Sequence, residues 1–232
     1  MTWRCGIAVF PGTWSERDCA HWVELAGGEP LMLWHAEREL KGADLVILPG
    51  GFAHGDYLRA GAIARFAPLM AAVRDHALAG GPVLGICNGF QILCEAQLLP
   101  GALLRNSCLQ FRCQSTHLRV EVSRGPLLSG LETGTVLRMP ISHGEGRYYA
   151  PPDQLQELEA GGQVALRYCG PTGELGEEHN PNGSLEHIAG VLNREGNVLG
   201  MMPHPERACE PLLGSEDGLQ LLRAALAVLG PR

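Results

Sequence analysis

The 232-residue sequence lacks any apolar run close to the roughly 20 residues that a membrane-spanning helix needs. The apolar stretch near its start, in MTWRCGIAVFPG, is too short for a span, has no signal-peptide cleavage region and is followed by charged residues. Lys and Arg number only 18 and are scattered, and the net charge is −7, so no basic footprint for nucleic acid is present. We expect a cytoplasmic protein that binds neither membranes nor nucleic acid.

Internal repeats, low-complexity tracts and a Gly-x-x-x-x-Gly-Lys-[Ser/Thr] phosphate loop are also lacking. Charged residues make up 19% of the chain, below the typical quarter, and hydrophobic residues make up 45%. This composition excludes a disordered chain and supplies a substantial core. The length fits one large domain or two small ones, and we favour a single domain over residues 1–232.

Cysteine is not scarce, and the eight cysteines show no regular spacing: Cys5, Cys19, Cys87, Cys94, Cys108, Cys113, Cys169 and Cys209. Without a signal peptide, reduced thiols are expected rather than a disulfide framework. Cys108, Cys113 and His117 resemble a metal cluster only faintly, because there is no Cys-x-x-Cys and no convincing fourth ligand. We therefore predict no metal site.

The first half of the chain alternates between strand and helix patterns. Buried strands are predicted at 4–10, 30–34, 43–51 and 82–87, and helices at 16–28 (with Ser15 as N-cap), 61–81 and 88–101. This alternation is typical of a parallel sheet with helices on both faces. We predict an α/β fold with a single doubly wound, mostly parallel sheet.

After Gly101 the pattern changes. Strands without intervening helices are predicted at 102–114, 116–123 and 135–142, followed by a short helix at 151–162 and a strand at 163–170. A polar loop covers 170–184, two strands surround a Glu-Gly-Asn turn within 186–206, and a helix capped by Ser215 ends the chain. These segments predict antiparallel strands added to the same sheet.

Gly85-Ile86-Cys87-Asn88-Gly89 lies between a buried strand and a helix. The Gly-x-Cys-x-Gly spacing is that of a nucleophile elbow with Cys in place of Ser. Unpaired amides and the dipole at the helix N-terminus favour a thiolate there. A glycine-bounded turn around an incidental buried cysteine would have the same pattern.

His204 and Glu206 form the second candidate, within Pro203-His204-Pro205-Glu206. Proline disfavours helix, and in an extended segment residues i and i+2 point to the same side. The carboxylate would then orient the imidazole, as in the base-plus-orienter half of a catalytic triad. The alternative is a proline-rich turn with a surface His and Glu, but a cysteine elbow elsewhere in the chain favours the catalytic interpretation.

Pro49-Gly50-Gly51-Phe52 follows another buried strand. Ligands gather outside the carboxyl ends of parallel strands. A glycine pair there can direct a backbone N–H at a developing oxyanion, with the N–H of Asn88 as the second donor. An ordinary strand-to-loop turn remains the alternative.

In their order along the chain, Gly-Gly, then Gly-x-Cys-x-Gly, then His-x-Glu, the three motifs resemble the class I glutamine amidotransferases, whose glutaminase domain has a doubly wound, flavodoxin-like fold. Longer segments are similar to the PurQ glutaminase subunits of phosphoribosylformylglycinamidine synthase, namely PGGFAHGDYLRAGAIA (49–64), GICNGFQIL (85–93), ISHGEGRY (141–148), NPNGS (180–184) and GNVLGMMPHPERA (196–208). That family often has Ser-Tyr where this chain has Ala53-His54, so the resemblance assigns no role to His54.

The resemblance implies that Cys87 attacks the glutamine side-chain amide, His204 transfers protons and Glu206 orients His204. It also implies that Gly50, Gly51, Phe52 and Asn88 surround the oxyanion, that Gln91 contacts glutamine, and that Gly144 and Gly146 hold its α-amino and carboxylate groups. The ammonia would pass to PurL, with PurS as the bridging subunit. ATP and magnesium would bind in the partner, and this chain would hold no cofactor.

Three alternatives remain open from the sequence. The chain could serve a different amidotransferase, such as one for anthranilate, carbamoyl phosphate or pyridoxal phosphate. It could be a DJ-1/PfpI-like cysteine hydrolase, although such proteins lack the late His-Pro-Glu arrangement. It could also be a non-catalytic interaction subunit, which Cys87, His204 and Glu206 together argue against.

Overall fold

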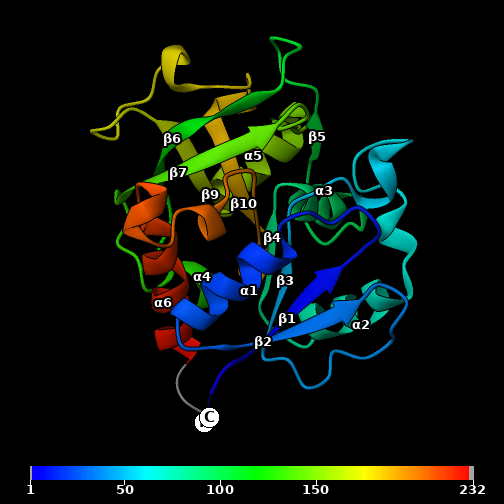
Figure 1. Ribbon diagram of the computed structural model, residues 1–232. Coiled ribbons are helices and arrows are strands. Elements are labelled where there is room, and N and C mark those ends of the chain that lie inside the picture. The colour runs from blue at the N-terminus through cyan, green and yellow to red at the C-terminus, as the bar shows by residue number, and fades with distance from the viewer. Residues whose placement is uncertain (1, 230–232) are drawn as a thin grey trace.

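The computed structural model describes residues 2–229, which form a nine-stranded mixed sheet in the order β2-β1-β3-β4-β11-β10-β9-β6-β7 (Figure 1). The first five strands run parallel: β2 (Glu29–Trp34), β1 (Arg4–Val9), β3 (Leu45–Leu48), β4 (Val83–Ile86) and β11 (Val198–Met201). β3, β4 and β11 are buried throughout, as expected for strands covered on both faces.

The other four strands continue the sheet with antiparallel pairing: β10 (Ile188–Leu192), β9 (Val164–Cys169), β6 (Arg112–Val120) and β7 (Val136–His143). β5 (Ala102–Leu104) and β8 (Arg147–Tyr149) form a separate two-stranded sheet. The predicted α/β class, a mostly parallel sheet with added antiparallel strands, is confirmed.

Helices cover both faces of the sheet. They are α1 (Glu16–Leu25), α2 (Pro68–Leu78), α3 (Asn88–Glu95), α4 (Gly125–Leu128), α5 (Pro152–Ala160) and α6 (Asp217–Leu229). α1 and α6 lie side by side, and the indole N–H of Trp22 donates to the carbonyl of Gly218 at 2.9 Å. The chain moves in opposite directions across the sheet from β1 to β2 and from β3 to β4, so right-handed connections place α1 and α2 on opposite faces. Arg74 joins α2 to the end of α3 by donating to the Ala96 carbonyl.

Two predicted elements differ most from the structure. The helix predicted at 61–81 begins only at Pro68, because Pro at the first helical position starts a helix and cannot continue one; before it lies a 3₁₀ turn at Ala64–Phe66. The strand predicted at 102–114 exists only as β5 and the start of β6, and the residues between form a loop. Ser15 occupies the N-cap position of α1, but its hydroxyl caps nothing there and instead accepts from the Gly50 N–H.

All eight cysteines are free thiols. Within residues 2–229, no helix is both long and apolar enough to cross a bilayer. In the same range, no three His, Cys, Asp or Glu side chains gather as a metal ion would require, and this includes Cys108, Cys113 and His117.

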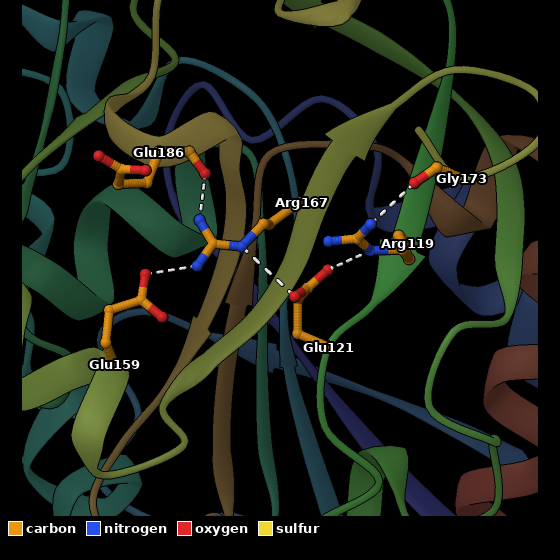
Figure 2. Close-up of polar contacts among 6 residues, drawn as sticks. All are labelled: Arg119, Glu121, Glu159, Arg167, Gly173 and Glu186. Atoms are coloured by element: carbon orange, nitrogen blue, oxygen red, sulfur yellow. Dashed lines mark hydrogen bonds and ion pairs between the residues drawn. The ribbon is translucent and has the colours of Figure 1, made fainter. Parts of the chain in front are cut away.

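A buried arginine joins the antiparallel strands to α5. Figure 2 shows the Arg167 guanidinium between Glu159 of α5, the carbonyl of Glu186 and Glu121, whose Oε2 lies 3.4 Å from Nε of Arg167. The other oxygen of Glu121 accepts from Nε of Arg119 at 2.6 Å. The side chain of Arg167 is only 10% exposed, whereas that of Arg119 is 28% exposed. Arg167 is therefore the more buried cation of this cluster, and it compensates the charges of both Glu121 and Glu159.

The cluster predicts unequal effects of two matched substitutions. Arg167→Met should lower the free energy of unfolding by roughly 2 to 3 kcal/mol, because it leaves Glu121 and Glu159 short of a buried cation. Arg119→Met should lower it by roughly 1 kcal/mol, since Glu121 keeps Arg167. Urea denaturation followed by circular dichroism measures both, and equal losses would contradict this account of the cluster.

Candidate active site

Three strand ends meet at one edge of the sheet. β4 pairs with β3 on one side, where Gly85 aligns with Leu48, and with β11 on the other, where Ile86 aligns with Met201. All three strands run parallel, so the residues that follow them emerge at the same edge. Segments far apart in sequence, around Gly50, Cys87 and His204, are thereby brought together.

Cys87 has a backbone conformation that non-glycine residues rarely adopt, with φ 51° and ψ −105°. The turn is held because the Cys87 N–H donates to the Met201 carbonyl at 2.8 Å. The flanking glycines permit close packing of α3 on the sheet: a Cβ on Gly89 would lie 1.9 Å from the Leu48 carbonyl oxygen, and one on Gly85 would lie 2.8 Å from Gly89. Strain of this kind at a cysteine is typical of a functional position.

The Cys87 side chain lies between two adjoining cavities of about 250 and 240 Å³. Both are lined by Cys87, Gly51, Phe52, Phe111 and Ser142. The first also contains His204 and Ser15, and the second contains Asp56, Gln91, Gly144 and Glu145. Cys87 is 6% exposed, and its Sγ lies 3.8 Å from the Ser142 carbonyl oxygen. A small ligand can therefore reach the sulfur through a largely buried cleft.

His204 and Glu206 form a buried pair, with Nδ1 of His204 2.7 Å from Oε1 of Glu206. The predicted contact is present, but its geometry differs from the extended segment that we expected. His204 has φ −105° and ψ 90°, and Pro205–Arg207 forms a 3₁₀ turn that brings the carboxylate to Nδ1 of the ring. The His204 N–H donates to the Pro140 carbonyl at 2.8 Å, which fixes the start of this turn.

Charge dominates the ionisation of this pair. Burial by itself lowers the pKa of His204, but the charges of Glu206 and Cys87 and the hydrogen bond with Glu206 outweigh burial and raise the pKa to about 10. Burial raises the pKa of Glu206, but the imidazolium of His204 outweighs it and brings the pKa below its ordinary value. The histidine is therefore held as an imidazolium in the cavity that also contains Cys87.

The glycine turn after β3 is fixed by the segment that follows β1. The Gly50 N–H donates to Oγ of Ser15 at 3.0 Å, and the Phe52 N–H donates to the Gly12 carbonyl at 2.9 Å. The Gly51 N–H has no hydrogen-bond partner within residues 2–229. Of the three residues predicted here, Gly51 keeps its amide available to a ligand, while Phe52 contributes its half-exposed ring to the cleft.

Gly50 has a steric reason to be glycine. A Cβ at this position would lie 2.7 Å from Cε1 of His204 and 3.3 Å from Oγ of Ser15. The turn and the imidazole therefore pack directly against each other.

Asn88 and Gln91 connect α3 to the two loops around the second cavity. Asn88 accepts from the Ala53 N–H at 3.0 Å and donates to Oε1 of Gln91 at 2.9 Å. The Gln91 amide then donates to the Glu145 carbonyl at 2.6 Å. Gln91 lines the cavity as predicted for a substrate contact, but it also has this structural role.

The two predicted glycines Gly144 and Gly146 have different positions: one lines the second cavity, and the other lies outside it. Gly144 lines the second cavity. Gly146 does not: its N–H donates to Oδ1 of Asn106 at 3.1 Å, and its carbonyl accepts from Asn182 at 2.8 Å. A Cβ on Gly146 would lie 2.3 Å from the His143 ring, so this glycine allows His143 to pack beside it.

Comparison with known proteins gives a consistent family assignment. Residues 2–217 match the CobB/CobQ-like glutamine amidotransferase domain family. The chain is 56% identical over 218 residues to the phosphoribosylformylglycinamidine synthase subunit PurQ of Moorella thermoacetica, covering 94% of this chain and 92% of the relative. It is also 56% identical over 228 residues to the PurQ subunit of Thermosynechococcus vestitus, covering 95% of each chain. The chain belongs to the PurQ family of glutamine amidotransferases.

Solved structures agree with this assignment. A chain in the structure of PurLQS from Thermotoga maritima matches with a TM-score of 0.88 and 42% identity, covering 99% of this chain and all of that one. The glutaminase domain of Trypanosoma brucei CTPS, solved with bound acivicin, matches at a TM-score of 0.61 and 14% identity over 97% of this chain and 94% of the other. The latter likeness shows the fold alone.

Sequence reasoning missed several residues of this PurQ-family site. Ser15 was assigned only to helix capping, Phe111 carried no motif, and Ser142 lies in the segment 141–148 that carries the resemblance but was given no role. Asn106 lies in a segment predicted as a strand, yet its side chain is buried and supports the turn at 144–146. His54 packs its ring against His35, with centroids 5.4 Å apart, and lines neither cavity.

The raised pKa of His204 predicts a pH-dependent stability that Glu206 controls. The contribution is fully present below the ordinary pKa of 6.5 and is lost as pH rises towards about 10. In Glu206→Gln the main raising cause is gone, so burial keeps the ring neutral. The stability difference between wild type and this variant should therefore shrink as pH rises from 6.5 to 10.

Urea denaturation at a series of pH values measures that difference. Glu210→Gln is the matched control, because Glu210 lies 3.4 Å from His21 in an exposed pair, where the same change in charge should matter little. A stability difference for Glu206→Gln that stays constant across the window would contradict the pairing.

Proposed function

We propose that the chain is the glutaminase subunit of phosphoribosylformylglycinamidine synthase, the activity named for its PurQ relatives. It would hydrolyse L-glutamine to glutamate and ammonia for use in purine biosynthesis. The observation that carries this proposal is the convergence of Cys87, the His204–Glu206 pair and the free Gly51 amide at one edge of the sheet. The 42% identity to a chain of PurLQS favours this synthase over the other amidotransferases considered.

The first half of the proposed reaction forms a thioester. The sulfur of Cys87, its proton held by His204, attacks the side-chain carbonyl carbon of glutamine. The carbonyl oxygen becomes an oxyanion that accepts hydrogen bonds from the amides of Gly51 and Asn88. When the tetrahedral species collapses, the proton on His204 goes to the leaving nitrogen, and ammonia departs.

The second half restores the enzyme. Water attacks the thioester, His204 accepts the water proton, and the same oxyanion contacts form again. Collapse releases glutamate and the Cys87 sulfur, while His204 keeps the proton taken from water, which restores the starting pair. Glu206 stays ionised throughout and keeps the Nδ1 hydrogen of His204 directed at itself, so that Nε2 serves the reaction.

The ammonia acceptor would lie in a partner. We propose association with PurL, the ATP- and magnesium-dependent subunit that would convert formylglycinamide ribonucleotide to the amidine, and with PurS. The PurLQS name of the matching structure supports such a complex. We further propose that residues 1–232 act as one cytoplasmic domain without its own cofactor, which the continuity of the nine-stranded sheet supports.

Replacing the nucleophile tests the proposal in the reconstituted complex. Cys87→Ala should lower glutamine-dependent synthesis of the amidine by more than about 1,000-fold, because no thioester can form. Synthesis from added ammonium salt should continue, since free ammonia bypasses this site. Both rates are measured by following product formation with ATP.

Cys94→Ala is the matched control, because Cys94 lies at the other end of α3 and lines neither cavity beside Cys87. It should keep both activities. Survival of glutamine-dependent synthesis in Cys87→Ala would show that Cys87 is not the nucleophile. Peptide cleavage by the wild type, without glutamine hydrolysis, would favour a different cysteine hydrolase.

A further inference from the structure

Asp56 places a carboxylate in the second cavity, beside the proposed nucleophile. It shares that cavity with Cys87, Gln91 and Glu145. Oδ1 of Asp56 accepts from the Asn88 side-chain amide at 3.3 Å and from the Gly61 N–H at 3.4 Å. These two contacts fix the orientation of the carboxylate, and they engage only one of its oxygens.

The backbone that carries Asp56 is strained. His54, Gly55 and Asp56 have φ values of 55°, 75° and 51°, so three consecutive residues occupy the left-handed region. Asp56 and His54 are not glycine, and such positions cost of order 1 to 3 kcal/mol each. The surrounding contacts maintain this conformation, and its result is a carboxylate turned towards the cavity.

Among the described residues, the charge of Asp56 has no cationic partner. Within residues 2–229, no Lys, Arg or His forms an ion pair with it. Glu145, the other acidic residue of the cavity, lies 3.4 Å from Arg105. Burial, with a smaller contribution from Glu145, raises the pKa of Asp56. A half-buried carboxylate in this setting is suited to a ligand that brings a positive charge.

We propose that Asp56 binds the α-ammonium group of glutamine while the side-chain amide lies at Cys87. This inference rests on the proposed glutaminase function. It goes beyond that function because it assigns a binding residue to the α-ammonium group, which a simple amide lacks. The ammonium is the only cationic group of glutamine. The α-carboxylate would be repelled by Asp56, so this carboxylate also sets the orientation of the substrate.

The position of Asp56 couples recognition to the reacting residues. Asn88 donates to both Asp56 and Gln91, and it directly follows Cys87. A ligand that engages Asp56 therefore contacts a network that begins at the N-terminus of α3. Asp56 is a binding residue in this account, and the bond-making steps remain with Cys87 and His204.

The test compares two chloroketones that alkylate the Cys87 thiol. One is the chloroketone analogue of glutamine, with its α-ammonium and α-carboxylate, and the other is its desamino counterpart. Second-order rate constants for alkylation of Cys87 in the assembled complex are measured by mass spectrometry. Wild type should prefer the ammonium compound, and Asp56→Asn should reduce that preference by about 10- to 100-fold, as expected for losing a charged hydrogen bond.

Glu145→Gln is the matched control, because it removes one charge from the same cavity but from a carboxylate that already has Arg105. It should retain the wild-type preference. Equal slowing of both reagents in Asp56→Asn would show a merely structural role and would overturn the proposal, as would loss of preference in Glu145→Gln alone. Iodoacetamide reports thiol reactivity without recognition. If iodoacetamide labels Cys87 but neither chloroketone does so in the wild type, the glutaminase function itself fails.

Discussion

The site depends on the pairing of β4 between β3 and β11. This pairing brings the ends of three parallel strands together, so the motifs that follow those strands lie next to one another at the same edge of the sheet. It also requires α3 to start directly above the sheet, where Gly89 touches the Leu48 carbonyl and Gly85 faces Gly89. The strained φ of Cys87 follows, because a strand must turn into a helix within one residue.

A second level of support comes from the segment after β1. Ser15 accepts from the Gly50 N–H, and its hydroxyl is also one of the groups that lower the pKa of Glu206. One side chain thus accepts from the glycine turn and also lowers the pKa of the carboxylate that orients His204. Gly50 adds to this coupling, since its missing Cβ leaves space for the imidazole. The proposed oxyanion turn and the His–Glu pair are therefore positioned as one packed unit.

The sequence predicted the parts of this arrangement that depend on local pattern. Buried strands ending in glycine, and the Gly-x-Cys-x-Gly and His-x-Glu spacings, were sufficient for the fold class and for the residues that the structure brings together. The resemblance, rather than spacing, pointed to the PurQ family. Long-range side-chain contacts could not be predicted this way: Ser15 looks like a helix cap, Asn106 lies in a segment with strand-like composition, and Asp56 lies in a polar loop. Their roles depend on residues 30 to 40 positions away, such as Gly50, Gly146 and Asn88.

Two buried histidines show most directly why sequence cannot assign ionisation. The pKa of His204 is raised because a carboxylate accepts its Nδ1 hydrogen, whereas His143 has only the amide oxygen of Asn106 at 3.2 Å. Asn106 donates its amide hydrogens to the carbonyls of Gln110 and His143, so its oxygen must be the acceptor and Nδ1 of His143 the donor. A neutral amide cannot compensate for desolvation, so burial, together with the charge of His204, lowers the pKa of His143 to about 4. The site therefore holds one imidazolium and one neutral imidazole near neutral pH, and the positive charge is confined to the ring that faces the thiol.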